Sequence, residues 1–585
     1  MLLCACVCLG VLLLIFAYGH YSWGVFQGYF SSAEIVILNV LPVVLLIFLL
    51  YALFGRAWLA FLLGGIMTLG LSIGNYYKLL FRDDPLYFED LLVIREAKTI
   101  TTQSQYTLFV DKRIVVAVLC LALGTVLLFF LVRGVARGWK RRVPVLAATV
   151  LAAALLWPAY KDNGIYDSIQ NFDYLNHWSG TQDYLSRGFL YPFVHGASQI
   201  KESAPEGYSE AEAQALLSEY TDADIPEDKR VSIISYMREA YIDFSQFAIP
   251  GLDCSGYDLY HQLESESYSG TLLTNIFGGG TIDSERCFLT GNYLLQNFRS
   301  DANSYVWYLR NQGYTVEGSH PYYRWFYNRR NVNGYLGFEN YRFREGDYEY
   351  LSEQTMVEDS VLLSEVYSDF VRNKSTGKPY FSFNLNIQSH GPYSTTEYDG
   401  AVEYLTGDYT DECKNAMNNY MATIMDSDVQ LMQLVENLRA DPDPVILVLF
   451  SDHMPWMGDG NVFYSEMGLN FDMDTEQGFR DYYSTRYLIW ANDAAKAVLG
   501  NDFTGTGPTI SPCYLMNLAF QQCGWEGPAF MQAMDDLREV FPVVTSNGCY
   551  VVDGMFTDQI PDERQELFRN FEYLQYDWRT KFISN

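Results

Sequence analysis

Two short segments carry the residue types that could do covalent chemistry in this chain. One is a glycine run ending in a threonine, Phe277-Gly-Gly-Gly-Thr281, and the other is Ser451-Asp452-His453, which follows the apolar run 445–450. Glycines remove side chains that would block a ligand, and their N–H groups can form an anion-binding nest. A carboxylate and an imidazole at the end of a buried strand can hold a divalent cation. Together the segments predict a metal-activated threonine nucleophile that acts on a phosphoester.

The elements that must position these residues are predicted from about Arg230 onward, where apolar strand-like runs alternate with helical patterns. Strands are predicted at Val231–Met237, Tyr314–Glu317, Phe381–Ile387, Val445–Phe450 and Tyr487–Trp490, and helices at Val357–Asn373 and Ala416–Leu438. Continuous apolar strands interleaved with helices favour an α/β domain with a mostly parallel sheet. Ligands bind beyond the carboxyl ends of such strands, where Glu239, His390 and Asp452 fall.

A mixed set of oxygen and nitrogen ligands is available there. Glu239, Asp452, His453 and the hydroxyl of Thr281 suit Mn²⁺, Mg²⁺ or Zn²⁺, with little power to distinguish these ions. Each residue alone also has a structural interpretation, as a surface charge, a capping partner or a turn residue. Three of the chain's seven histidines nevertheless follow strand-like runs in this region: His320, His390 and His453. That concentration favours a functional site.

Five apolar stretches fill the first 160 residues: roughly Leu2–Tyr18, Ile35–Leu53, Trp58–Asn75, Ile114–Val132 and Val143–Tyr160. A membrane-spanning helix needs about 20 mostly apolar residues, and the first stretch is the shortest. A cleaved signal peptide would explain only that stretch, and Met1 is not followed by the basic residues of such a peptide. The sequence predicts a five-span membrane domain over residues 1–160.

Basic residues set the predicted orientation. The loop Arg133–Arg142 is the densest positive cluster and is expected in the cytoplasm, as is Arg56. A juxtamembrane connector (161–229) and a catalytic domain (230–585) are then expected on the extracellular side of the cell membrane. Residues 1–160 hold 12 basic and 7 acidic side chains, against 27 and 63 beyond them. So acidic a domain disfavours nucleic acid as a partner.

Cysteine usage leaves the redox chemistry open. Six of the ten cysteines fall in the predicted extracellular part: Cys254, Cys287, Cys413, Cys513, Cys523 and Cys549. An even number there permits disulfides, but the sequence cannot select the pairing. No CxxC pair occurs, which disfavours a structural zinc site.

The motifs and their order resemble those of lipoteichoic acid synthase and its phosphoglycerol transferase relatives, which are membrane members of the alkaline phosphatase and sulfatase superfamily. The resemblance covers nearly the whole chain. It is carried by Asn75–Pro85, Met237-Arg-Glu239-Ala-Tyr, Phe277–Gly291 with its Leu-Thr-Gly ending, Gln388-Ser-His390-Gly-Pro-Tyr393, and Tyr573-Leu-Gln-Tyr576-Asp577. It implies an alkaline phosphatase-type catalytic domain outside the membrane.

The resemblance also implies roles for individual residues. Glu239, Asp452 and His453 would hold one ion, Mn²⁺ by expectation, together with Thr281, which becomes covalently modified. His320, Tyr327 and Arg329 would contact the substrate, and His390 would serve as a hydrogen-bond donor or general acid/base. The implied reaction moves glycerophosphate from phosphatidylglycerol to a hydroxyl of a glycolipid or polymer acceptor, through a phospho-threonine. It belongs to the synthesis of lipoteichoic-acid-like envelope polymers.

Several positions depart from the family pattern. Tyr327 stands where tryptophan is usual, Tyr322 where aspartate is usual, and Ser451 where glycine is usual. Arg286 stands where an acidic or apolar residue is common. These departures touch recognition of the head group more than the metal, so they leave the exact substrate open.

Three alternatives remain at this stage. A phosphoethanolamine transferase would share the spans and the threonine nucleophile. A sulfatase is disfavoured because Thr281 is not part of a Cys/Ser-x-Pro-x-Arg pattern. A catalytically retired binding protein is disfavoured because Glu239, Thr281, Asp452 and His453 are all present. The acceptor and the oligomeric state stay open.

Overall fold

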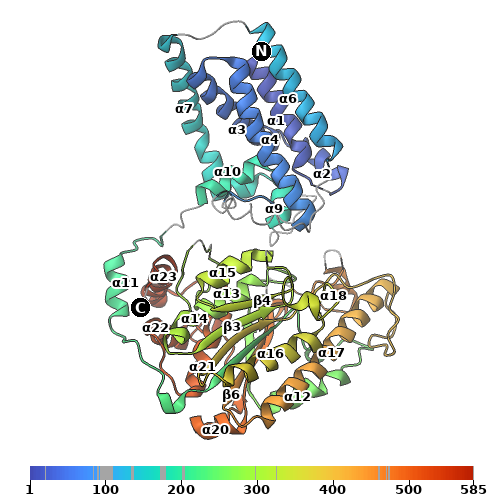
Figure 1. Cartoon of the computed structure of the whole chain (residues 1–585), viewed down its shortest axis with the longest axis vertical. Coiled ribbons are helices and arrows are strands. Elements are labelled where there is room, and N and C mark those ends of the chain that lie inside the picture. The colour runs from blue at the N-terminus through green and yellow to red at the C-terminus, as the bar shows by residue number, and fades with distance from the viewer. Residues whose placement is uncertain are drawn as a thin grey trace. The chain divides into compact units, whose positions relative to one another are not determined.

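The structure is a computed structural model that describes residues 1–19, 21–82, 85–88, 91, 110–132, 138–171, 180–199, 204–296, 298, 300–324, 326–458, 461–469, 471 and 475–583. The chain forms two compact units, Met1–Ser203 and Ala204–Asn585, which divide the predicted connector between them (Figure 1). Residues 133–137 of the predicted basic loop, and residues 83–84 of the Asn75–Pro85 motif, lie outside the described residues.

Unit 1 contains four described helices that are long and apolar enough to cross a membrane: α3 (Ala33–Phe54), α4 (Ala57–Arg82), α6 (Lys112–Leu131) and α7 (Trp139–Lys161). The first predicted span falls short. It forms α1 (Leu2–Leu13) and the 3₁₀ turn η1 (Leu14–Phe16), after which Gly19 takes a φ of 55°. Four of the five predicted spans are thus supported by length and composition, because the first provides fewer than the ~20 helical residues that a bilayer core requires.

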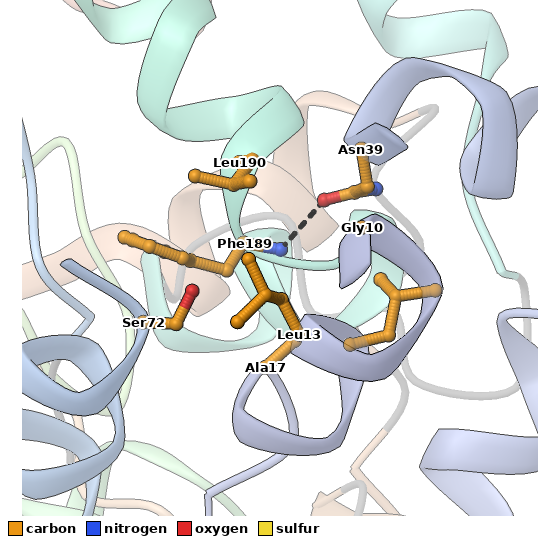
Figure 2. Close-up of a pocket in the computed structure, with 8 residues that line it drawn as sticks. Gly10, Leu13, Ala17, Asn39, Ser72, Phe189 and Leu190 are labelled. Atoms are coloured by element: carbon orange, nitrogen blue, oxygen red, sulfur yellow. Dashed lines mark hydrogen bonds between the residues drawn. The ribbon is translucent and has the colours of Figure 1, made fainter. Parts of the chain in front are cut away.

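Four shorter helices complete the described part of unit 1: α2 (Trp23–Gly28), α8 (Asn163–Ser168), α9 (Gly180–Arg187) and α10 (Leu190–Gln199). The buried Asn39 of α3 joins the α9–α10 turn to the long helices. Its amide group donates to the carbonyls of Ile35 and Arg187, at 2.8 and 2.7 Å, and its oxygen accepts from the backbone of Phe189 and Tyr191, at 3.0 and 3.2 Å. Figure 2 shows one of these hydrogen bonds, from the Phe189 N–H to the Asn39 oxygen, among the residues that line a small, mostly apolar cavity.

Unit 2 is built on an eight-stranded sheet with the order β4-β3-β5-β1-β6-β7-β2-β8. The strands are β1 (Ser232–Arg238), β2 (Tyr268–Leu273), β3 (Thr315–His320), β4 (Asn340–Phe343), β5 (Tyr380–Leu385), β6 (Val445–Ser451), β7 (Ser484–Ala491) and β8 (Gly505–Thr506). The five from β4 to β6 are parallel, and β7 runs antiparallel to both neighbours. The mostly parallel α/β prediction is confirmed, whereas β2, β4 and β8 were not anticipated.

Both faces of this sheet are buried, which explains the near-continuous apolar strands. In β6, Ile446, Val448 and Phe450 join one core, and the alternate residues Val445, Leu447 and Leu449 join the other. The first core contains α13 (Ile282–Thr290), α14 (Tyr305–Asn311), α21 (Leu515–Cys523), α22 (Ala529–Val540) and α23 (Gln565–Thr580). The second contains α12 (Asp258–Ser265), α16 (Asp359–Lys374) and α17 (Asp411–Ala440) (Figure 1).

The remaining described elements of unit 2 are peripheral to this sheet. They are helices α11 (Glu210–Leu217), α15 (Arg329–Tyr335), α18 (Val462–Glu466), α19 (Glu476–Tyr483) and α20 (Asp493–Leu499), and a small antiparallel sheet of β9 (Val543–Val544), β10 (Tyr550–Val552) and β11 (Met555–Thr557). All ten cysteines are free thiols, so none of the disulfides that the sequence permitted is formed.

Candidate metal centre and nucleophile

The metal-binding residues predicted from the sequence meet at the carboxyl edge of the sheet. Strands β1 and β6 are parallel neighbours in which Arg238 pairs with Ser451, so the next residues, Glu239 and Asp452, lie side by side. One ligand atom from each of Glu239, Asp452 and His453 lies within 4.8 Å of the others. The imidazole Nε2 is 3.1 Å from Asp452 Oδ2 and 3.7 Å from Glu239 Oε1.

Hydrogen bonds aim the free atoms of this group toward a common point. Asp452 Oδ1 accepts the backbone N–H groups of Ala240 and His453, both at 2.8 Å, while Asp452 Oδ2 has no hydrogen-bond partner among the described residues. The Nδ1 atom of His453 lies 2.8 Å from the carbonyl of Met454, which leaves an unpartnered Nε2 lone pair. Buried polar atoms without partners are costly, and a divalent cation would satisfy both. These residues therefore fit a metal ion.

The charge balance supports the same conclusion. Burial and the adjacent negative charge of Asp452 raise the pKa of the Glu239 carboxyl well above its ordinary value, and the nearby imidazole and Thr281 only partly offset this. Two buried carboxylates repel each other unless a cation lies between them. A bound divalent ion would remove that cost and hold Glu239 ionised.

A buried polar network lies behind Glu239 and fixes its backbone. The Asn386 side chain accepts the N–H of Glu239 at 2.6 Å and donates to Asp359 at 2.9 Å, and Ser389 donates to the Glu239 carbonyl at 2.5 Å. Ala240 takes a φ of 50°, an uncommon conformation for a residue other than glycine. Such conformations persist where surrounding contacts enforce them, often at functional sites.

Thr281 enters the same site from the glycine loop. Gly278, Gly279 and Gly280 have φ values of 66°, 152° and 86°, and a Cβ at Gly278 would lie 2.9 Å from the ring of Trp456. Glycine is therefore required there by both conformation and space. The loop delivers Thr281 to the N-terminus of α13, where its hydroxyl donates to Glu239 Oε2 at 3.1 Å.

Arg329, predicted to contact the substrate, lies in a buried ion pair. Its Nε donates to Glu285 Oε2 at 2.8 Å, and both side chains are almost fully buried. Its charge also lowers the pKa of Glu239, so it acts on the metal centre. Tyr327 places its ring 5.2 Å from the Arg329 guanidinium and has a φ of 56°.

Of the two remaining predicted histidines, His320 ends β3, and His390 lies five residues after the end of the neighbouring strand β5. His320, the last residue of β3, places Nδ1 3.2 Å from the carbonyl of Leu385 at the end of β5, and its Nε2 has no partner among the described residues. Burial and the charge of Arg329 lower its pKa, which keeps it neutral. His390 is half-buried, with Nδ1 2.5 Å from the Gly391 carbonyl, and it directly follows the Ser389 that bonds to Glu239.

Glu285 was missed as a candidate for the site, and Arg286 was noted only as a departure from the family pattern. Glu285 lies one helical turn after Thr281, and its N–H bonds to the Thr281 carbonyl. No helix was predicted here, so the i, i+4 spacing that places both side chains on one helix face gave no signal without the structure. Asn386 and Ser389 were also missed, and their proximity to the β5 terminus is the only sequence cue.

The closing Leu-Gln-Tyr-Asp motif contacts the C-terminal end of α13, the helix that follows Thr281. Gln575 donates to the carbonyl of Gly291 at 2.9 Å and accepts the N–H of Tyr293 at 3.2 Å, and the indole of Trp578 donates to Thr290 at 2.8 Å. Gly291 caps α13 in the left-handed conformation, with a φ of 74°. The Leu-Thr-Gly ending and the C-terminal motif are thus two halves of one structural contact.

Comparison with known proteins identifies similar sequences. Residues 243–515 match the family model described as Sulfatase, a range that begins four residues after Glu239. Over 563 residues the chain is 25% identical to a Rhizobium meliloti protein provisionally named for cyclic beta-1,2-glucan modification. That alignment covers 90% of this chain and 83% of the relative.

Solved structures give weaker likenesses. The Streptococcus pyogenes phosphoglycerol transferase GacH, in complex with sn-glycerol-1-phosphate, has a TM-score of 0.47 at 16% identity and covers 64% of this chain and 95% of its own. The integral membrane lipooligosaccharide phosphoethanolamine transferase A of Neisseria meningitidis has a TM-score of 0.44 at 15% identity, with coverage of 90% and 98%. Residues 243–515, which include Thr281, His390, Asp452 and His453, therefore match the sulfatase family, in a chain that also carries four helices of membrane-spanning length.

Proposed function

We propose that this chain is a metal-dependent phosphotransferase that moves glycerophosphate from phosphatidylglycerol to an acceptor hydroxyl, through a covalent intermediate on Thr281. One observation carries the proposal. The Thr281 hydroxyl lies 3.1 Å from Glu239, inside a buried group of two carboxylates and one imidazole with unpartnered ligand atoms. A structural threonine does not need this surrounding, whereas a nucleophile does.

The chain's residues supply the steps of the transfer. When bound by Glu239, Asp452 and His453, with Thr281, a divalent ion (Mn²⁺ by expectation, Mg²⁺ or Zn²⁺ otherwise) supplies Lewis acidity and lowers the pKa of the threonine hydroxyl. Thr281 Oγ1 forms a bond to phosphorus, and the bond from phosphorus to the diacylglycerol oxygen breaks. His390 gives that oxygen its proton, and the proton lost by Thr281 leaves through its hydrogen bond to Glu239.

The second half of the reaction reverses the first with a new alcohol. An acceptor hydroxyl attacks the phosphorus of the glycerophospho-threonine, and His390 takes its proton. The bond from phosphorus to Thr281 Oγ1 breaks, and Thr281 regains its proton along the hydrogen bond to Glu239. Arg329 is the residue suited to bind the phosphoryl oxygens, because a guanidinium presents two parallel donors. Negative charge develops on those oxygens in the transition state, so this is where electrostatic stabilisation counts most.

The acceptor is proposed to be an envelope glycan or glycolipid. The Rhizobium meliloti relative, which aligns along most of this chain, is named for modification of a glucan. An uncharged carbohydrate also suits a region with 63 acidic and 27 basic side chains beyond residue 160, since that region repels polyanions.

The experiment is mass spectrometry of Thr281 after the full-length protein is incubated with Mn²⁺ and vesicles of phosphatidylglycerol. The wild type gains one glycerophosphate, and Thr281→Ala gains none while it still binds Mn²⁺. Thr290→Ala is the matched control, because Thr290 is a buried threonine at the other end of α13 whose hydroxyl bonds only to nearby backbone.

Three outcomes contradict the proposal. Retained transferase activity in Thr281→Ala would rule out this nucleophile. Stoichiometric Mn²⁺ binding without turnover of any phosphodiester lipid would instead indicate a binding protein that has lost catalysis. An adduct that carries ethanolamine would assign the chain to phosphoethanolamine transfer.

A further inference from the structure

A buried cluster of charges adjoins the nucleophile helix, and the proposed reaction does not account for all of it. Arg329 pairs with Glu285, as described above. Arg286, the next residue along α13, donates from Nη2 to the backbone carbonyl of Tyr327 at 3.0 Å. Arg286 is 5% exposed, so a second guanidinium is held beside the first, and no carboxylate among the described residues forms an ion pair with it.

This cluster carries excess positive charge. Burial and the neighbouring Arg329 lower the pKa of Arg286 to about 10, which leaves it protonated at neutral pH. Within the described chain, Glu285 is the carboxylate that forms the ion pair with Arg329 and whose charge also acts on Arg286, whereas Glu239, which Arg329 also influences, belongs with Asp452 to the candidate metal centre. His320, on the adjoining strand end, is neutral. Two guanidiniums against one carboxylate leave a net charge of one positive unit.

The cluster also contains buried hydrogen-bond donors and acceptors that have no partner among the described residues. Among the described residues, Arg286 Nε and Arg329 Nη1 are donors without acceptors. Glu285 Oε1 and His320 Nε2 are acceptors without donors, because His320 directs Nδ1 at the Leu385 carbonyl. Such atoms are rarely left unsatisfied in a native protein. A ligand with anionic oxygens and hydroxyl groups would satisfy all four.

We propose that Arg286 is a specificity-determining residue, which with Arg329 selects phosphodiester donors whose head group is an uncharged polyol over donors whose head group carries an ammonium. A polyol offers hydroxyl donors to Glu285 and His320 without adding charge. An ammonium could reach the same acceptors, but it would be placed beside two guanidiniums in a site with little water to screen the repulsion. The inference rests on the proposed function and deepens it.

Arg286 is an informative residue for this role because the sequence pattern does not require a cation there. Its guanidinium is almost fully buried, and its hydrogen bond goes to a backbone carbonyl rather than to an acid. Its contact with Tyr327 also ties it to the loop that ends in Arg329, at a residue whose φ of 56° needs support from outside the loop. The positive charge of Arg286 and its contact with the Tyr327 loop can be tested separately. A lysine at this position keeps the charge and loses much of the loop contact.

The test is a competition between two lipids for Thr281. Full-length protein with Mn²⁺ is mixed with vesicles of equal phosphatidylglycerol and phosphatidylethanolamine, and the two adducts are counted by mass spectrometry. The wild type should favour glycerophosphate at least tenfold. In Arg286→Gln the ratio should fall several-fold, whereas Arg286→Lys should keep most of it. Arg330→Gln, which removes an exposed positive charge from the same segment, should leave the ratio unchanged.

Each result is decisive. Equal use of the two lipids by the wild type, or an unchanged ratio in Arg286→Gln, overturns the inference while phosphotransfer by Thr281 stands. An adduct from neither lipid removes the proposed function itself. Should Arg286→Gln fail to fold, the wild-type ratio and that of Arg286→Lys still decide, because loss of selectivity in the lysine variant would show that charge is not the selecting feature.

Discussion

Asn39 in unit 1 and the Asp452–His453 pair in unit 2 are both buried and polar, yet they differ in how their hydrogen-bonding capacity is used. Asn39 uses both amide hydrogens and both oxygen lone pairs, on four backbone groups. Asp452 and His453 each direct one atom to backbone, and the other atom of each has no hydrogen-bond partner in the part of the chain that the structure describes. A satisfied polar group holds structure together, whereas converging unsatisfied ones indicate a missing ligand.

Convergence matters more than the number of unpartnered atoms. Single buried atoms without partners also occur elsewhere in unit 2, at the indole of Trp490 for example. Around Thr281, buried atoms without partners among the described residues occur on four different elements of the chain. The residues that carry them include carboxylates, guanidiniums and imidazoles. The comparison therefore makes opposite predictions for the two regions: removing a partner at Asn39 should reduce stability, and removing charge at Asp452 should reduce ligand binding.

The largest expected effect is on metal binding in Asp452→Asn. Asparagine keeps the Oδ1 acceptor for Ala240 and His453 but loses the charged Oδ2 ligand. Loss of groups that merely support a metal ligand costs about 10- to 100-fold in affinity, so loss of the ligand should cost at least about 100-fold. Calorimetric titration with Mn²⁺ measures it. The metal-free variant should unfold no more readily than the wild type, because a buried like-charge pair is removed; marked destabilisation in EDTA would contradict this account.

The second effect concerns the ion pair beside the nucleophile. Glu285→Gln leaves Arg329 and Arg286 buried without a counter-charge, which should destabilise unit 2 by about 3–5 kcal/mol. Denaturant titration measures the loss. Inorganic phosphate should restore part of it, because an anion that binds only the folded state stabilises that state. Equal effects of phosphate on wild type and variant would show that the cluster does not receive anions.

Removal of the Asn39 side-chain amide in unit 1, whose hydrogen bonds are all made, should have a smaller effect on stability. Asn39→Leu has similar volume but strands the N–H groups of Phe189 and Tyr191 and the carbonyl of Arg187. Interhelical hydrogen bonds in membrane proteins average about 0.6 kcal/mol, and stranded buried groups cost more, so a loss of about 1–3 kcal/mol is expected. Unfolding in SDS measures it. Mn²⁺ affinity should not change; a variant with normal stability and weakened metal binding would reverse the comparison.

Patterns along the chain predicted the scaffold well for physical reasons. Strands β1, β5 and β6 are buried on both faces, so their apolar runs are continuous and easily recognised. The short strands β2 and β4 were missed because each mixes polar and apolar residues, as in Tyr268-Ser-Gly-Thr271. The first predicted span is not among the four helices long enough to cross a membrane, because its helix ends before Gly19 although its composition is apolar.

The candidate site was predictable only where chain position implies spatial position. Glu239 and Asp452 follow parallel strands, so their proximity follows from the sheet once the strands are known. The Arg286–Tyr327 contact joins a helix to a loop 41 residues away, through a left-handed turn that no local pattern encodes. For the same reason Glu285 was missed as the partner of Arg329. Pairings of this kind are set by tertiary packing.

The smallest predicted effect separates the two regions by titration, because an amide such as Asn39 has no proton to lose and Glu239 does. In the metal-free protein the raised pKa of Glu239 means that the folded state keeps a proton that the unfolded chain releases above about pH 4.5. This contribution to stability is therefore full at low pH and is lost as pH rises through the raised pKa, at no more than about 1.4 kcal/mol per pH unit.

Urea titrations in EDTA between pH 5 and 8 should show this fall in the free energy of unfolding with pH, and Glu239→Gln should remove it. Saturating Mn²⁺ should reverse its sign, because the ion binds the ionised carboxylate. The free energies of unfolding of wild type and Glu239→Gln should therefore differ by an amount that changes with pH. A constant difference would mean that protein groups already neutralise this carboxylate, so that the site, like Asn39, has its polar groups satisfied without a ligand.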